Sequence, residues 1–192
     1  MRQKRRGFTV AELSIVMIVM GLLLGMMFKA QEIIRTAKLK RVVSDFQSIS
    51  TAIYTYEDRY GELPGDDSRS VIAKGMQLRG NSDGHIDAIE SKSVMRHLRK
   101  AGLVAGEASD NTMRHALDGP VWVIQANLAD QLPNTSAVMP SMARTAVCFE
   151  NVHGDDAAIL DSANDDGDYA KGSIQANSDY TQAVFVTLCS EL

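Results

Sequence analysis

Residues 8–28 read FTVAELSIVMIVMGLLLGMMF, an apolar run of 21 residues with a single charge, Glu12. A helix of this length spans roughly 31 Å at about 1.5 Å per residue, which matches the hydrocarbon core of a bilayer. The run therefore predicts a membrane-spanning helix. A buried helix of a soluble protein is the alternative interpretation, and the length of the run and its basic flank argue against it.

The flanks of the run indicate its orientation and its fate. The preceding segment, 1–7, holds four basic residues and no acid. Basic residues stay on the cytoplasmic side of a membrane, so we expect the remainder of the chain to lie outside. A secretory signal peptide would have about 7–15 apolar residues and then a small-residue cleavage site. Here the run is longer and no A-x-A pattern follows, which favours an anchor that stays in the mature protein.

The helical pattern continues over residues 29–60. Apolar residues recur there every three or four positions, as on one face of an amphipathic helix. They are Leu39, Val42, Val43, Phe46, Ile49, Ile53 and Tyr56. The turn signal at 61–66, GELPGD, ends the pattern. We predict one helix from about residue 9 to about residue 59, whose second half carries a globular domain at 61–192.

The globular domain contains signals for both helices and strands. Runs of β-branched and aromatic residues predict strands, and two polar segments with apolar spacing predict helices. The predicted strands are 121–124, 146–149 and 183–188, and the predicted helices are 91–102 and 155–163. A long helix packed on a small antiparallel sheet is an α+β fold.

The beginning of the chain resembles a known processing signal. Arg5-Arg6-Gly7 followed by Phe8-Thr9-Val10-Ala11-Glu12-Leu13 is similar to the class III signal of type IV prepilins and type II secretion pseudopilins. The resemblance implies that a prepilin peptidase cuts between Gly7 and Phe8, removes residues 1–7 and methylates the new amine of Phe8. It also implies that Glu12 pairs with the amine of a neighbouring Phe8 during assembly. Where many members of the family have a proline, this chain has Lys29.

The same resemblance implies a fold, partners and a location. The fold is that of type IV pilins, with the long helix packed on a small antiparallel sheet. The partners are other copies of the chain in a helical fibre, other pilins or pseudopilins, the peptidase and an inner-membrane assembly platform. The chain would sit in the bacterial inner membrane with its globular domain in the periplasm, and then in a pilus or pseudopilus.

Cys148 and Cys189 are the only two cysteines, and both fall in or next to predicted strands of the outer domain. An oxidising compartment favours a disulfide between them. Cysteine pairs near the C-terminus are also frequent in the pilins that the chain resembles. Two buried free thiols are the alternative.

Two acidic, glycine-containing loops are candidate calcium sites, because calcium prefers oxygen ligands. The first holds Asp161, Asp165, Asp166 and Asp168, and some pseudopilins bind calcium near the C-terminus. It is not an EF-hand, since a serine stands at the first ligand position when Gly167 is the turn glycine. The second is the segment 81–87. Turn chemistry in solvated loops is the alternative for both, and no other cofactor is predicted.

The sequence predicts a structural protein and not an enzyme. It has no HExxH, GxSxG or Walker motif, and no GxGxxG follows a strand. The four histidines are interpreted as surface or capping residues, and Arg96, Arg99 and Lys100 as a solvated basic face. The net charge of −4 argues against nucleic-acid binding. A pilin or pseudopilin subunit is the preferred function. The alternatives are a membrane-anchored ligand- or calcium-binding module that does not polymerise, and an anchored enzyme.

Overall fold

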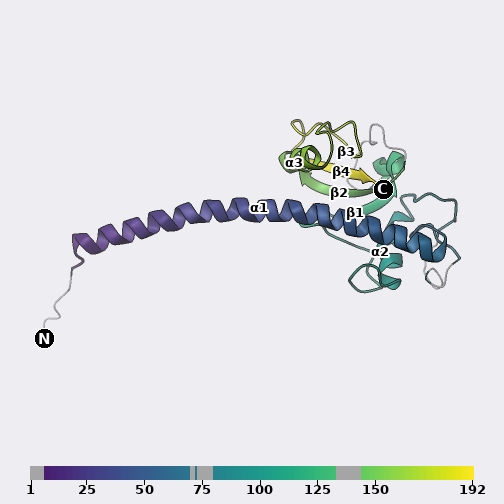
Figure 1. Ribbon diagram of the computed structural model, residues 1–192, viewed down its shortest axis with the longest axis horizontal. Helices are drawn as coiled ribbons and strands as arrows, with labels where there is room; N and C mark the ends of the chain where they lie inside the picture. Colours follow the sequence, from purple (N-terminus) through teal and green to yellow (C-terminus); the bar gives the residue numbers. More distant parts are fainter. Residues whose placement is uncertain (1–6, 70–71, 73–79, 133–143) are drawn as a thin grey trace. The chain divides into compact units, whose positions relative to one another are not determined.

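The computed structural model describes residues 7–69, 72, 80–132 and 144–192 (Figure 1). These residues form four helical segments and four strands. In order they are α1 (Val10–Tyr60), α2 (Ser91–Lys100), β1 (Val121–Gln125), η1 (Ala126–Gln131), β2 (Thr145–His153), α3 (Gly154–Asn164), β3 (Ile174–Ala176) and β4 (Phe185–Glu191). The chain divides into two compact units, Met1–Lys38 and Leu39–Leu192. The predicted α+β fold, with a long N-terminal helix and a small antiparallel sheet, is confirmed.

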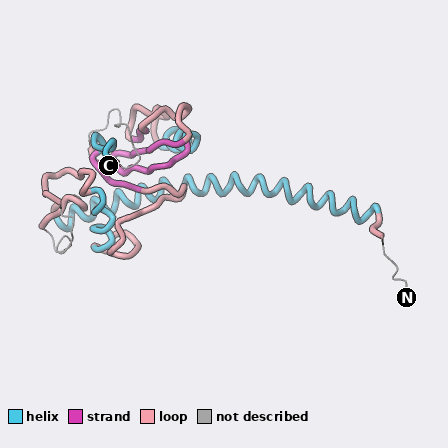
Figure 2. The backbone as a smooth tube through the Cα atoms, turned by 180° about the vertical axis from the view of Figure 1, so that it is seen from behind, coloured by secondary structure: helices cyan, strands magenta, loops and turns pink. Residues whose placement is uncertain are grey.

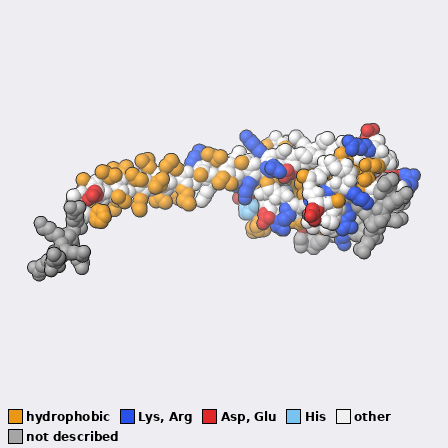
Figure 3. Space-filling model, turned by 90° about the horizontal axis from the view of Figure 1, so that it is seen from below, with side chains coloured by type: hydrophobic (Ala, Val, Ile, Leu, Met, Phe, Trp, Pro, Cys, Tyr) orange, Lys and Arg blue, Asp and Glu red, His pale blue; other side chains and the backbone are white. Residues whose placement is uncertain are grey.

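The first unit contains the apolar part of α1. Each of its residues from Val10 to Lys38 is exposed in the single chain. Apolar side chains cover this part of the helix on the face seen in Figure 3. The helix contains a stretch that is long and apolar enough to cross a membrane, by length and composition. A helix that is apolar all round needs lipid or other protein around it.

In the second unit, α1 changes character. From Leu39 onward, residues three or four apart turn inward and are buried in the core. The buried residues are Leu39, Val42, Ile49, Ala52, Ile53 and Tyr56, while Val43 and Phe46 are half-buried against them. The predicted stripe is confirmed, with Ala52 as an additional member. Burial of each large apolar side chain contributes about 1.5–3 kcal/mol to stability.

A tight turn follows α1 and fixes the position of α2. Gly61 ends the helix with a φ of 74°, and its N–H donates to the Glu57 carbonyl over 2.7 Å. Gly65 has a φ of 103°, and a Cβ there would lie 2.8 Å from Cγ2 of Val94 on α2. Only glycine tolerates both this conformation and this approach. The LPGD segment is therefore a packed structural turn.

The four strands form one antiparallel sheet in the order β1-β2-β4-β3 (Figure 2). β1 and β2 include the predicted strands, and β2 extends to His153 through an irregularity between Phe149 and Val152. β4 begins two residues later than predicted and continues to Glu191. The sequence analysis missed β3 and η1, since β3 has only three residues and shows no alternation to detect.

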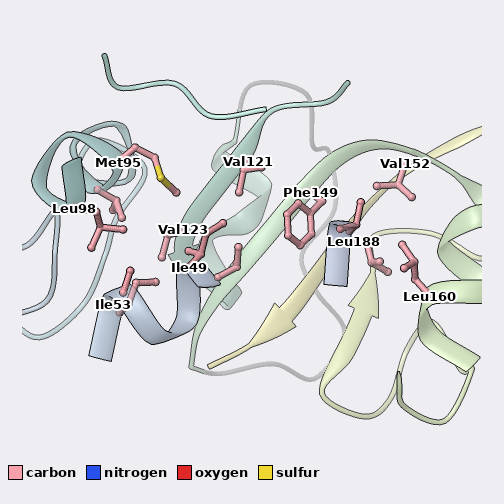
Figure 4. Close-up of a cluster of buried hydrophobic side chains, with 14 of the residues drawn as sticks. Ile49, Ile53, Met95, Leu98, Val121, Val123, Phe149, Val152, Leu160 and Leu188 are labelled. Carbon is pink, nitrogen blue, oxygen red and sulfur yellow. The ribbon is translucent and has the colours of Figure 1, made fainter. Parts of the chain in front are cut away.

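Side chains alternate between the two faces of the sheet and form two clusters. On one face, residues of α1, α2 and α3 meet the strands (Figure 4). Figure 4 shows Ile49, Ile53, Met95, Leu98, Val121, Val123, Phe149, Val152, Leu160 and Leu188 in this cluster. On the other face, η1 covers a smaller cluster that includes Ile124, Ala146 and the two cysteines.

Candidate functional site

The segment 7–9 precedes the helix, and α1 begins at Val10. Thr9 and Glu12 hold this beginning by reciprocal hydrogen bonds. The backbone N–H and the hydroxyl of Thr9 donate to Oε2 of Glu12 over 2.9 and 3.1 Å, and the N–H of Glu12 donates to the Thr9 hydroxyl over 3.2 Å. This is a capping box, in which the first and fourth residues satisfy each other's backbone donors.

The bond between Gly7 and Phe8 lies outside the helix. Phe8 is 81% exposed, and a Cβ added to Gly7 would meet no atom within 4 Å. Among the described residues nothing crowds this peptide bond, and its acyl residue has no side chain in the way. The geometry fits a bond that a peptidase hydrolyses, which would leave the Phe8 amine four residues before Glu12, the acid in the first turn of α1.

Glu12 lies in the first turn of α1, where the positive end of the helix dipole favours an acid. Its Oε2 accepts both donors from Thr9. An ionised acid in an apolar span is costly and is a functional candidate for that reason.

The predicted acidic loop after α3 assembles in part. The carboxylates of Asp161, Asp165 and Asp166 offer oxygens within 4.8 Å of one another. Asp161 is buried, and its two oxygens accept from the hydroxyl of Tyr180 over 2.6 Å and from the N–H of Gly167 over 3.3 Å. Burial raises the pKa of the Asp161 carboxyl.

The fourth predicted ligand, Asp168, does not join this group. Its carboxylate accepts from the ammonium of Lys171 and from the N–H of Ala170, and the bond to Lys171 lowers the pKa of Asp168. In the described part of the chain the metal candidate therefore consists of three aspartates and not four.

A second acidic group forms in the segment 81–90, and it includes two residues that the sequence analysis missed. Oxygens of Asp66, Asp83 and Glu90 lie within 4.8 Å of one another. Asp66 is fully buried, and its two oxygens accept the N–H groups of Asp83 over 3.2 Å and Gly84 over 2.8 Å. A turn 17 residues away in sequence thus organises the loop.

Glu90 closes the same loop from its other end. Its oxygens accept the N–H of Asn81 over 3.0 Å and the N–H of Asp87 over 3.1 Å. Glu90 is 5% exposed, and burial followed by the charges of Asp87 and Asp66 raises the pKa of its carboxyl. Among the described residues, no lysine or arginine forms an ion pair with Asp66, Asp83 or Glu90.

The spacing in this loop follows most of the EF-hand pattern. With Gly84 as the turn glycine, Asn81, Asp83, Asp87 and Glu90 take the third, fifth, ninth and twelfth positions. Gly84 has a φ of 85°, as the sharp turn requires. In the sequence, an arginine occupies the first position of the EF-hand pattern. The acid missing there has a counterpart in Asp66, which no local pattern links to the loop.

Two histidines are buried, contrary to the prediction of surface or capping roles for all four. His97 is fully buried, and its Nδ1 accepts the N–H of Gly65 over 3.1 Å. His115 is 3% exposed and contacts the Glu150 carbonyl over 2.7 Å. His85 is exposed, and His153 caps α3 as predicted. The prediction was wrong for His97 and His115 because tertiary packing covers them.

The prediction of a solvated basic face on α2 was also wrong. The side chain of Arg99 is 8% exposed, and it donates to the carbonyls of Ala105 over 3.1 Å and Asp110 over 2.8 Å. Arg96 donates to the Ser109 carbonyl over 3.1 Å, and Lys100 to that of Ile72 over 2.7 Å. Arg96 and Arg99 thus hold the loop after α2, whose carbonyl groups lack strand partners, whereas Lys100 is exposed, as predicted, and reaches a residue before α2.

The predicted disulfide is present. Cys148 on β2 and Cys189 on β4 stand directly opposite each other, with Cα atoms 4.0 Å apart. Both side chains are fully buried in the smaller cluster. The bond joins the two central strands of the sheet across a sequence separation of 41 residues.

The chain matches no curated protein and no solved structure. One family model matches, the prokaryotic N-terminal methylation motif, over residues 2–28. The match includes the Gly7–Phe8 bond, the capping box and Glu12. The beginning of this chain is therefore the signal of a type IV prepilin-like protein, followed by the apolar helix that such a signal precedes.

Proposed function

We propose that this chain is a structural subunit of a type IV pilus or a type II secretion pseudopilus. A prepilin peptidase cuts it between Gly7 and Phe8, and the mature chain polymerises through α1. The observation that carries this proposal is the methylation motif at residues 2–28 with its cleavage bond outside the helix. The chain is the substrate of the peptidase and not a catalyst.

The exposed apolar surface of α1 supports polymerisation. All residues from Val10 to Lys38 are exposed in the single chain. Lipid provides this surface with a suitable environment before assembly, and neighbouring helices can replace lipid in a fibre. Burial against either one satisfies the apolar side chains equally, so another interaction must favour the fibre.

Glu12 provides that interaction. An acid within an apolar span costs about 3 kcal/mol in a membrane. In a fibre the amine of a neighbouring Phe8, which exists only after cleavage, neutralises the carboxylate. The gain depends on a second chain at one axial position, so it favours assembly in one register.

The partners and location follow from this role. We expect contacts with other copies, with other pilins or pseudopilins, with the peptidase and with an inner-membrane assembly platform. The globular domain lies in the periplasm, where oxidising conditions permit the Cys148–Cys189 disulfide. An assembled pilus or pseudopilus then carries the domain outward.

Mass spectrometry of the mature chain tests the cleavage. We expect a chain that begins with N-methylated Phe8, and the full precursor in cells that lack the peptidase. A mature chain that retains Met1 in peptidase-containing cells contradicts the proposal.

The Glu12→Gln variant tests the assembly role. Glutamine preserves the capping box but removes the charge. We expect normal cleavage and membrane insertion, with fibres lost in electron micrographs. Ser14→Ala, a nearby polar substitution, serves as the control and should assemble. Normal fibres from Glu12→Gln would exclude the proposed pairing.

Calcium binding is a second candidate function, and the group Asp66, Asp83 and Glu90 favours it. Two of the three carboxylates are buried, and their mutual repulsion has no cationic counterpart among the described side chains. A hard divalent cation with oxygen ligands would balance this charge. Such a site serves either a pilin subunit or the alternative, an anchored module that does not polymerise.

Thermal unfolding of the mature chain in detergent tests calcium and separates the two acidic loops. Saturation at a hundredfold over the dissociation constant stabilises a protein by about 2.7 kcal/mol. We expect the calcium-dependent rise in Tm to disappear in Asp83→Asn and to persist in Asp166→Asn. The reverse pattern would assign calcium to the loop after α3, and a Tm independent of calcium in the wild type would exclude both.

A further inference from the structure

The start of α1 lies close to the Gly7–Phe8 bond and affects whether a peptidase can reach that bond. A peptidase must reach the carbonyl carbon of Gly7, and the residues after it form a helix of 51 residues. Helices in an apolar environment tend to extend, because each backbone N–H without a partner there is costly. Whether the cleavage bond stays outside the helix therefore depends on what prevents α1 from extending towards the N-terminus beyond Val10.

Thr9 prevents this extension by capping the helix. The first four N–H groups of a helix have no partner within the helix. Here the N–H of Glu12 finds the Thr9 hydroxyl, and the N–H of Thr9 finds the Glu12 carboxylate. The next N–H along the chain, that of Leu13, donates to the Thr9 carbonyl over 3.2 Å and makes the first regular helical bond.

Without the box, these donors would need other acceptors. A helix extended by one turn would recruit the Gly7 carbonyl as the acceptor for the N–H of Ala11, following the regular i to i−4 pattern. That carbonyl belongs to the bond that the peptidase cuts. Its helical hydrogen bond would have to break before the peptide could enter an active site as extended chain.

We propose that Thr9 is a positioning residue for prepilin cleavage: together with Glu12 it fixes the start of α1 at Val10 and keeps the Gly7–Phe8 bond in non-helical, accessible chain. This inference rests on the proposed function, because it assumes that the bond is cut. It assigns Glu12 two separable tasks. Its hydrogen-bonding oxygen closes the cap before cleavage, and its charge acts in assembly after cleavage.

The proposal predicts a particular kinetic pattern. Loss of the cap converts precursor molecules to an extended helix and leaves the chemical step unchanged. The fraction of precursor whose Gly7–Phe8 bond is accessible to the peptidase then falls. The apparent affinity falls by that fraction, so KM rises and kcat does not change. Loss of an N-cap shifts a helix equilibrium by about 5-fold to 30-fold, which is the upper limit of the rise in KM.

The test uses the full-length precursor in membrane vesicles with a prepilin peptidase. Thr9→Val keeps the shape of the side chain and removes its hydroxyl, so we expect a raised KM, by at most about 30-fold, with kcat unchanged. Thr9→Ser and Thr9→Asn both cap helices well and should restore the wild-type KM. Glu12→Gln, which completes a capping box, should also be cut normally, whereas Glu12→Ala should behave like Thr9→Val.

The outcomes separate this inference from the proposed function. A wild-type precursor that is not cut overturns both. A wild-type precursor that is cut, together with Thr9→Val cut at the same KM, overturns only the positioning role. A fall in kcat for Thr9→Val, or failure of Thr9→Asn to restore KM, shows direct contact with the peptidase and also overturns it. Alkaline extraction of the vesicles verifies that each variant is inserted.

Discussion

The two halves of α1 share one backbone geometry and differ in where their side chains find partners. Residues 10–38 are exposed throughout, whereas residues 39–60 bury one stripe of side chains in the core of the same chain. The backbone hydrogen bonds are satisfied within the helix in both halves. The difference shows that the backbone hydrogen bonds of a helix do not depend on its surroundings, whereas the burial of its side chains does.

The sequence pattern of each half accounts for this difference. Between Val10 and Phe28 apolar residues surround the helix, so no single face is distinguished, and only an apolar solvent or other helices can cover them all. From Leu39 onward apolar residues keep to a spacing of three or four, which leaves other positions for ions such as the exposed Arg41, 2.8 Å from the half-buried Asp45. One half is thus suited to association and the other to folding.

The largest expected effect comes from the same substitution in each half. Ile53 is fully buried and Ile18 is 64% exposed. We expect Ile53→Ala to lower the free energy of unfolding of the globular unit by about 2–5 kcal/mol, because it leaves a cavity. Ile18→Ala should leave that free energy unchanged. Denaturant unfolding of the full chain in detergent, followed by the fluorescence of Trp122, measures both. A comparable loss from Ile18→Ala would show that the apolar half contributes to the stability of the domain.

An acid-dependent loss of stability should come from the end of the folded half. Tyr56 of α1 donates to Asp67 over 2.7 Å and lies beside His97, with the two rings 5.9 Å apart. Burial lowers the pKa of His97 from 6.5 to about 4, against the opposing charge of Asp67. His97 is therefore protonated near pH 6.5 in the unfolded chain, but only near pH 4 in the folded chain.

The stability contributed by neutral His97 is complete above pH 6.5 and is lost as the pH falls towards 4, by about 3 kcal/mol in total. Unfolding measured between pH 7 and pH 4 should show this fall in the wild type and in His85→Gln, whose histidine is exposed. His97→Gln should lack it over the same interval. An unchanged pH dependence in His97→Gln would assign the fall to other groups.

The smallest effect should come from ion pairs along the helix, one in each half. Arg41 and Asp45 are four residues apart on the folded half, and Lys29 and Glu32 are three apart on the other, 2.7 Å from each other. Ion pairs between helix residues three or four apart contribute only about 0.3–0.5 kcal/mol when at least one partner is exposed, as Arg41 is. We expect Arg41→Ala to cost that amount in unfolding of the globular unit and Lys29→Ala to cost nothing. A loss above 1 kcal/mol from Arg41→Ala would indicate a packing role for its side chain.

Local pattern was sufficient for the long elements. The bounds of α1, α3 and the core of β1 and β2 agree with prediction within a few residues, because periodic apolar spacing and β-branched runs are local properties. β3 was missed because three residues carry no period. The burial of His97 and Arg99 was missed because each depends on a packed turn outside α2: the turn at Gly65 covers His97, and the loop after α2 folds back over Arg99.

The cleavage signal, the apolar helix and the stripe on its second half could all be derived from the order of the residues, since charge, length and period act between near neighbours. The tertiary structure decided which acids meet. Asp66 and Glu90 stand 24 positions apart, and only the turn after α1 and the docking of α2 bring their carboxylates to one loop. It also placed Cys148 opposite Cys189, because strand register depends on contacts between distant segments that no local pattern specifies.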